Sequence, residues 1–182
     1  MKLYILLIMF CSNLFCSENT AKALSELNYN QRYILVKTFY DSKEFVKTKN
    51  ERLLLTAIAW KESNFGEKLE SKTNDFGVFQ INLKSFNSRF GEQLKSNNLD
   101  KYAKNMLRNN HKVGMMAAVA ELNFWKQKYP KDLDKVIASY NDGSDITQVG
   151  KDYATDIKER IAVLDSYLKT ISSNNLKTTQ KI

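Results

Sequence analysis

The sequence predicts a mainly α-helical domain with one small β-hairpin or irregular loop inserted between helices. Apolar residues recur at helical intervals in several segments, and only one short segment is β-prone. The chain holds 6 glycines and 1 proline, whereas barrels and sandwiches need many turns built from those residues. With 182 residues, 43% of them hydrophobic, we expect one globular domain with short appendages.

Helical periodicity defines five segments of the chain, and we expect each of them to be a helix. They are Ala21–Val46, Glu51–Glu62, Val113–Lys128, Leu133–Tyr140 and Asp152–Ile171. In the third segment the expected buried face consists of Met116, Val119, Ala120 and Phe124.

The pattern changes between the second and third helices. Residues Ser71–Asp75 have turn chemistry, and Phe76–Asn82 is short and β-prone. We expect these residues to form the inserted hairpin or loop. A cleft beside this insertion is the expected location of a ligand site.

Residues 1–17 have the pattern of a secretory signal peptide. Lys2 precedes an apolar run that gives way to small residues near Ser17 and is too short for a comfortable membrane span. We expect cleavage there, which leaves a domain over residues 18–172 and a flexible polar tail over 173–182. Two alternatives stay open: an uncleaved membrane anchor, and lipidation of Cys16, which the bulky Phe15 before it disfavours.

The chain is basic, with a formal charge of +8 and a pI near 9.3. Such a charge suits nucleic acid, an anionic membrane or an anionic polymer such as the bacterial cell wall. Its lysines are scattered, and the export signal conflicts with nucleic-acid binding. No group of His, Cys and Asp has metal-ligand spacing, so we expect no metal and no cofactor. His111, the 1 histidine of the chain, is expected at the surface.

Glu62 is the candidate catalytic residue that the helical pattern singles out. It follows Ile58 by four positions and Ala59 by three, so it continues an apolar stripe near a helix end. Apolar surroundings and the negative end of the helix dipole both raise the pKa of a carboxyl group. A carboxyl that stays protonated near neutral pH can act as the general acid that glycosidic cleavage requires. The alternative is a glutamate that simply extends into solvent.

Four blocks of sequence together resemble the signature of soluble lytic transglycosylases. The first runs from Glu62 to Asn82 and contains a Glu-Ser-x-Phe helix end, a serine nine positions after the glutamate and a Gly-Leu-Met-Gln-like strand. The other three are Asn110 with Gly114, Ala138–Gly143, and Tyr153 with Ile157. They cover roughly residues 50–165 in the order found in that family.

The segment Asp75–Asn82 refines this resemblance. It is most similar to the small transglycosylases that accompany secretion systems, pili and conjugation machines, which are exported and open the wall locally. It also resembles the Asp-Tyr-Gly-Ile-Leu-Gln-Ile-Asn stretch of animal lysozymes, in which the aspartate is the second catalytic carboxylate. The larger transglycosylases usually carry no acid at the position of Asp75.

The resemblance implies a lysozyme-like α+β fold and a periplasmic enzyme that acts on peptidoglycan glycan strands. A lytic transglycosylase cleaves the β-1,4 bond between N-acetylmuramic acid and N-acetylglucosamine and closes a 1,6-anhydro ring, with Glu62 as acid and then base. A secretion, conjugation or pilus apparatus is the implied partner. The alternatives are a muramidase that uses water with Glu62 and Asp75, and a non-catalytic wall-binding component of a secretion apparatus.

The first block also implies roles for residues of the insertion. Asp75 would stabilise positive charge on the sugar or act as nucleophile, unless it only shapes the turn. Ser71 would contact the region of Glu62 or the N-acetyl group, unless it serves the turn. Gly77 would let the backbone approach a sugar, or satisfy the hairpin alone. Gln80 would bind substrate, or support the loop.

The later blocks imply three more substrate-binding residues. Tyr140 and Asn141 are expected in the cleft as partners of Glu62 and the glycan, with an ordinary helix end as the alternative. Tyr153 is expected as a cleft wall, with a place in the hydrophobic core as the alternative.

Overall fold

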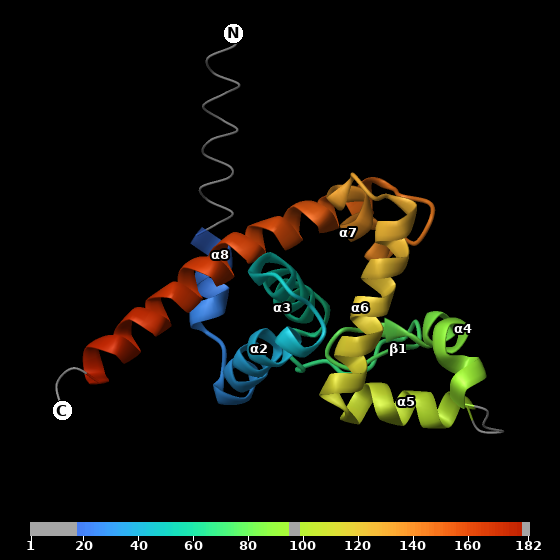
Figure 1. The fold of residues 1–182 in the computed structure, drawn as a ribbon, viewed down its shortest axis with the longest axis horizontal. Coiled ribbons are helices and arrows are strands. Elements are labelled where there is room, and N and C mark those ends of the chain that lie inside the picture. The colour runs from blue at the N-terminus through green and yellow to red at the C-terminus, as the bar shows by residue number, and fades with distance from the viewer. Residues whose placement is uncertain (1–17, 95–98, 180–182) are drawn as a thin grey trace, which may run out of the picture.

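The computed structural model describes residues 18–94 and 99–179 and confirms the mainly helical fold with one small hairpin (Figure 1). A helix over residues 18–25 comes first. The elements after it are α2 (Tyr29–Asp41), the 3-10 turn η1 (Ser42–Glu44), α3 (Lys49–Ser63), β1 (Asp75–Phe76), β2 (Ile81–Asn82), α4 (Leu83–Leu94), α5 (Leu99–Asn109), α6 (His111–Lys128), α7 (Leu133–Asp142) and α8 (Gln148–Thr179).

The last helix ends later than expected, whereas the expectation for the N-terminus lies outside the described residues. The predicted signal peptide lies outside the described residues, as do residues 180–182. Helix α8 continues to Thr179, eight residues beyond the end predicted at Ile171. Within the described ranges, no helix combines the length and apolar character needed to cross a membrane.

Side-chain caps set the starts of the first two long helices. Asn28 accepts from the backbone N–H of Gln31, whose side chain accepts from Asn28 in return. This capping box divides the single stretch predicted over Ala21–Val46 into two helices. Thr48 and Glu51 form the same reciprocal arrangement at the start of α3.

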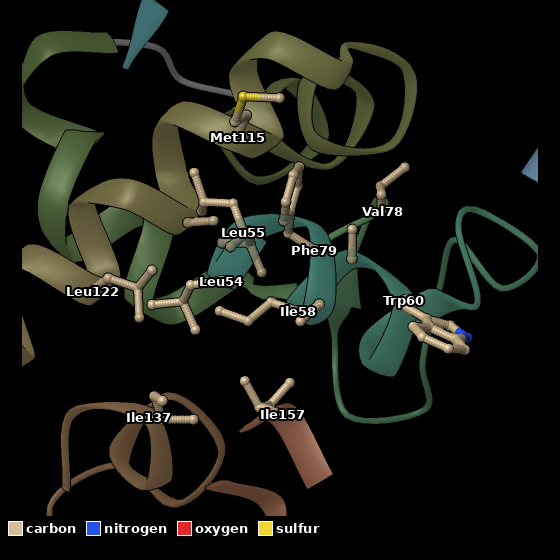
Figure 2. Close-up of a cluster of buried hydrophobic side chains, with 14 of the residues drawn as sticks. Leu54, Leu55, Ile58, Trp60, Val78, Phe79, Met115, Leu122, Ile137 and Ile157 are labelled. Atoms are coloured by element: carbon tan, nitrogen blue, oxygen red, sulfur yellow. The ribbon is translucent and has the colours of Figure 1, made fainter. Parts of the chain in front are cut away.

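Helix α3 is the centre of the hydrophobic core. Every residue from Leu53 to Trp60 is buried, because α2, α6 and α8 all pack around this helix. Figure 2 shows Leu54, Leu55 and Ile58 of α3 among side chains from the other elements: Phe79, Met115, Leu122, Ile137 and Ile157. The stripe predicted on one side is therefore part of a helix that is buried all round.

The structure differs from the sequence analysis at two places in the middle of the chain. The buried face of α6 contains Met115, Leu122 and Trp125, whereas Met116 and Phe124 of the predicted face are 37% and 44% exposed. Apolar residues surround α6, so periodicity alone did not select the correct side. Helices α4 and α5 were not predicted, although each contributes buried apolar residues, Leu83 and Phe86 from α4 and Ala103 and Leu107 from α5.

The hairpin is held against the end of α3 and the end of α5. Ser63, 1% exposed, donates from its hydroxyl to the carbonyl of Val78 and accepts from the N–H of Gly66. Gly77 has φ +80°, and a Cβ there would lie 2.1 Å from the carbonyl oxygen of Leu107. The glycine therefore allows the hairpin to pack closely on α5, and it is not one of the described residues that line the cleft around Glu62.

Candidate active site

A cleft of about 530 Å³ lies where the end of α3 meets the hairpin and helices α4, α6 and α7. Its walls contain Glu62 of α3 and Asp75 of β1, so the structure brings the two predicted carboxyl groups to one cavity. The described residues that line it also include Thr73, Gln80, Asn82, Ser85, Arg89, Glu121, Trp125, Ser139, Tyr140, Asn141 and Asp142. A larger hollow of about 1060 Å³ beside α5 contains neither Glu62 nor Asp75.

Glu62 is half-buried in the last turn of α3. The Tyr153 hydroxyl donates a hydrogen bond of 2.5 Å to its Oε1. Burial raises the pKa of Glu62 to about 7, with a smaller upward contribution from the negative charge of Asp75. The bond from Tyr153 and the charge of Lys61 act in the opposite direction. A carboxyl group with such a pKa is protonated in a large fraction of the molecules at neutral pH and can still release its proton.

Tyr153 occupies a different place from the one expected. It is 5% exposed on α8 and is not among the described residues that line the cleft. Its hydroxyl reaches the Glu62 side chain from α8. Burial, together with the charge of Glu62, raises the pKa of Tyr153 well above its ordinary value, so the hydroxyl remains a donor.

Asp75 lines the cleft and also organises the turn. Its Oδ2 accepts from the hydroxyls of Ser71, at 2.7 Å, and Thr73. Its Oδ1 accepts from the side-chain amide of Asn82 at 2.8 Å. The cleft therefore pairs Glu62, whose pKa is raised to about 7, with an acidic side chain that is held in place by hydrogen bonds to both of its oxygens.

The other predicted residues of the insertion act on the loop itself. Ser71 bonds to Thr73 and Asp75, and it is not one of the described cleft-lining residues. Gln80 does line the cleft, but its amide donates to the carbonyls of Lys68 and Gly77 at 3.1 and 2.8 Å. It has φ +45°, and these two bonds hold that unusual backbone in place.

The end of α7 contributes Tyr140 and Asn141 to the cleft, as expected. The Tyr140 hydroxyl donates to the carbonyl of Phe79 at 3.0 Å, so it fixes the hairpin and is not the hydrogen-bonding partner of Glu62. Asn141 is exposed and donates to Asp142. Asp142 accepts from the N–H groups of Thr147 and Gly150, which ties the start of α8 to the end of α7.

Comparison with known proteins identifies the chain's relatives. The family described as the transglycosylase SLT domain matches residues 40–161. The chain belongs to this family. It is also 34% identical over 118 residues to a protein of Enterobacteria phage T4 described as an uncharacterized 20.7 kDa protein in the vs-regB intergenic region. That match covers 64% of this chain and 61% of the phage protein. No solved structure matches the chain.

Three cleft residues of this SLT domain were not found from the sequence. Arg89 of α4 forms a salt bridge of 2.6 Å with Glu121 of α6, and the indole N–H of Trp125 donates to the same glutamate at 2.6 Å. Arg89 and Glu121 lie 32 positions apart, and α4 was not expected as a helix. No local pattern therefore marked them as neighbours.

His111 is not the surface residue that we expected. Its ring is half-buried beside Phe79, and its Nε2 lies 3.1 Å from the hydroxyl of Thr38. Burial lowers the pKa of His111 to about 4, so the ring is neutral at physiological pH. In the described part of the chain, no three His, Cys, Asp or Glu side chains are grouped as metal ligands.

Proposed function

We propose that this protein is a peptidoglycan lytic transglycosylase in which Glu62 acts first as acid and then as base. The observation that carries the proposal is the half-buried Glu62, with a pKa of about 7 and a bond from Tyr153, at the wall of a cleft. Membership of the SLT family supports action on peptidoglycan.

The proposed reaction needs one carboxyl group for both proton transfers. Glu62 protonates the oxygen between N-acetylmuramic acid and N-acetylglucosamine, and the bond to the anomeric carbon breaks. The Tyr153 hydroxyl, bonded to Oε1, stabilises the carboxylate that forms. Glu62 then takes the proton of the muramic acid 6-hydroxyl while that oxygen bonds to the anomeric carbon. The 1,6-anhydro ring closes and no water is consumed.

Asp75 supports a second candidate function, a muramidase that transfers the sugar to water. A carboxylate in the same cleft as the acid is the arrangement of retaining glycosidases. We favour a role in which Asp75 stabilises the positive charge that develops on the sugar, because its two oxygens already accept bonds from the loop.

Product analysis distinguishes the two reactions. We expect purified protein to release muropeptides that end in 1,6-anhydro-muramic acid when it digests isolated cell wall. Such products weigh one water less than the hydrolytic products, and mass spectrometry measures the difference. Reducing muramic acid ends in their place would support the muramidase, and no soluble muropeptide at all would contradict both functions.

The pH dependence of wall cleavage should follow Glu62. The acid must be protonated, so we expect activity to fall as pH rises through about 7. Phenylalanine at Tyr153 removes a bond that lowers the pKa of Glu62, so the alkaline limb should move to higher pH. Rate against pH for the wild type, Tyr153→Phe and Tyr140→Phe measures this. The limb should not move in Tyr140→Phe, because that hydroxyl donates to Phe79, and equal shifts in both variants would contradict the assignment.

We also propose that the protein acts outside the cytoplasmic membrane, in the periplasm, where it opens the wall for a secretion, conjugation or pilus apparatus. The signal-peptide pattern of residues 1–17 supports export. The net charge of +8 suits an anionic wall.

A further inference from the structure

One wall of the cleft contains a fixed guanidinium group that the proposed reaction does not use. Two nitrogens of Arg89 contact the same Glu121 oxygen: Nε donates at 2.8 Å and Nη2 lies at 2.6 Å. The guanidinium carbon lies 4.1 Å from the centre of the Phe124 ring. Trp125 donates to the other oxygen of Glu121. The two charged side chains are only 20% and 14% exposed, so Arg89 is held in one orientation.

The pairing with Glu121 occupies one edge of the guanidinium group. Nη1, at the other edge, carries two further N–H donors in the same plane. Arg89 lines the cleft, and its described hydrogen bond and ion pair go through Nε and Nη2 to Glu121. A planar donor group that is fixed in advance loses little conformational entropy when it binds.

Ser139 provides a second, independent sign of a ligand in this cleft. Its side chain is 1% exposed on α7, and it lies among the cleft-lining residues. Within the described part of the chain its Oγ has no hydrogen-bonding partner. A buried hydroxyl without a partner is unfavourable, and a polar atom of a bound molecule would satisfy it.

The charge of the cleft indicates what kind of atom these donors meet. Glu62, Asp75, Glu121 and Asp142 all line it, whereas Arg89 is the one basic side chain among its described residues. Glu121 already balances the charge of Arg89. An additional free carboxylate would meet an excess of negative charge, so a neutral oxygen is favoured.

We infer that Arg89 is a substrate-binding residue that donates hydrogen bonds to neutral oxygens of an N-acetyl sugar, with the Ser139 hydroxyl as a second contact. Hydroxyl and acetamido oxygens of the glycan supply this chemistry. Glu121 is the positioning residue that holds the guanidinium group. This inference rests on the proposed function, since it concerns the same glycan in the same cleft.

Calorimetric titration with the N-acetylglucosamine tetramer tests the inference in a Glu62→Gln background, in which binding is measured without cleavage. We expect Arg89→Lys, which keeps the charge but loses the planar fork, to weaken binding roughly tenfold. Arg108→Lys is the matched control. Arg108 pairs with Glu70 at 3.2 Å and is not among the described residues that line the cleft, so its replacement should leave the affinity unchanged. Equal affinities for the Arg89 and Arg108 variants would overturn the inference.

Further variants separate binding from folding. Ser139→Ala removes one atom and should weaken tetramer binding roughly threefold without lowering the melting temperature. In wall digestion, Glu121→Gln should raise KM and change kcat little. A loss of affinity limited to muramyl fragments with a free lactyl carboxylate would contradict recognition of neutral oxygens. If the wild type cleaves wall but tetramer binding does not depend on Arg89, this inference alone is refuted. If binding depends on Arg89 but the wild type does not cleave wall, only the proposed function is refuted.

Discussion

Glutamine at Glu62 is expected to slow wall cleavage by about 10³- to 10⁴-fold, near the top of the range for loss of a general acid. The amide has no proton of suitable acidity to give to the leaving oxygen, and it cannot later serve as the base. It keeps the shape of the carboxyl group, and its oxygen can still accept the bond from Tyr153. The fold should therefore remain intact. Release of soluble muropeptides per unit time measures the change.

Glu70→Gln is the matched control for this experiment. Glu70 is exposed and lies outside the cleft, beside Arg108. The same change of chemistry there should leave the rate of cleavage near that of the wild type. A folded Glu62→Gln protein that still lyses wall at the wild-type rate would show that Glu62 is not the acid. That result would favour a wall-binding role for the cleft.

Asparagine at Asp75 is expected to slow cleavage by roughly 10²-fold. The substitution removes the negative charge that faces the developing positive charge of the sugar, while the amide can still take part in the turn with Ser71 and Asn82. A second effect follows from Glu62. The charge of Asp75 raises the pKa of Glu62, so its removal should lower that pKa and move the alkaline limb of activity to lower pH.

The rate of wall cleavage and the position of its alkaline limb, measured together for Asp75→Asn, decide the role of Asp75. Asp145→Asn, an exposed position in the turn between α7 and α8, is the control and should change neither. If Asp75→Asn also changed neither, Asp75 would be a residue of the turn alone. The two readouts are independent, because the first concerns charge on the sugar and the second concerns the proton on Glu62.

The helical fold and the position of Glu62 were predictable because both depend on residues close together in sequence. Helix α3 has a short, regular run of apolar residues, and Glu62 follows Ile58 and Ala59 within it. Its environment was predictable only in part. That the last turn of an apolar helix raises a carboxyl pKa is a local argument, but the donor that opposes the rise comes from α8.

The rest of the site depends on contacts that no local pattern records. The sequence motif drew attention to Tyr153 and Tyr140, yet it did not show that the first contacts Glu62 while the second contacts the hairpin. Gly77 was recognised as a point of close approach, but its neighbour is the carbonyl of Leu107. Arg89 and Glu121 come from α4 and α6, and only the folded chain brings these two residues together at the cleft.

The hydrogen bond from Tyr153 to Glu62 bears on the stage of folding at which Glu62 acquires its raised pKa. It joins residues 91 positions apart, and the bond from Tyr140 to Phe79 spans 61. Closing loops of this length costs entropy and is slow compared with forming a single helix. We therefore expect the surroundings of Glu62 to assemble late in folding, after α8 docks on α3. Until then residue 62 is a solvated glutamate, ionised at neutral pH, and a chain that is incomplete or still unfolded cannot cut glycan.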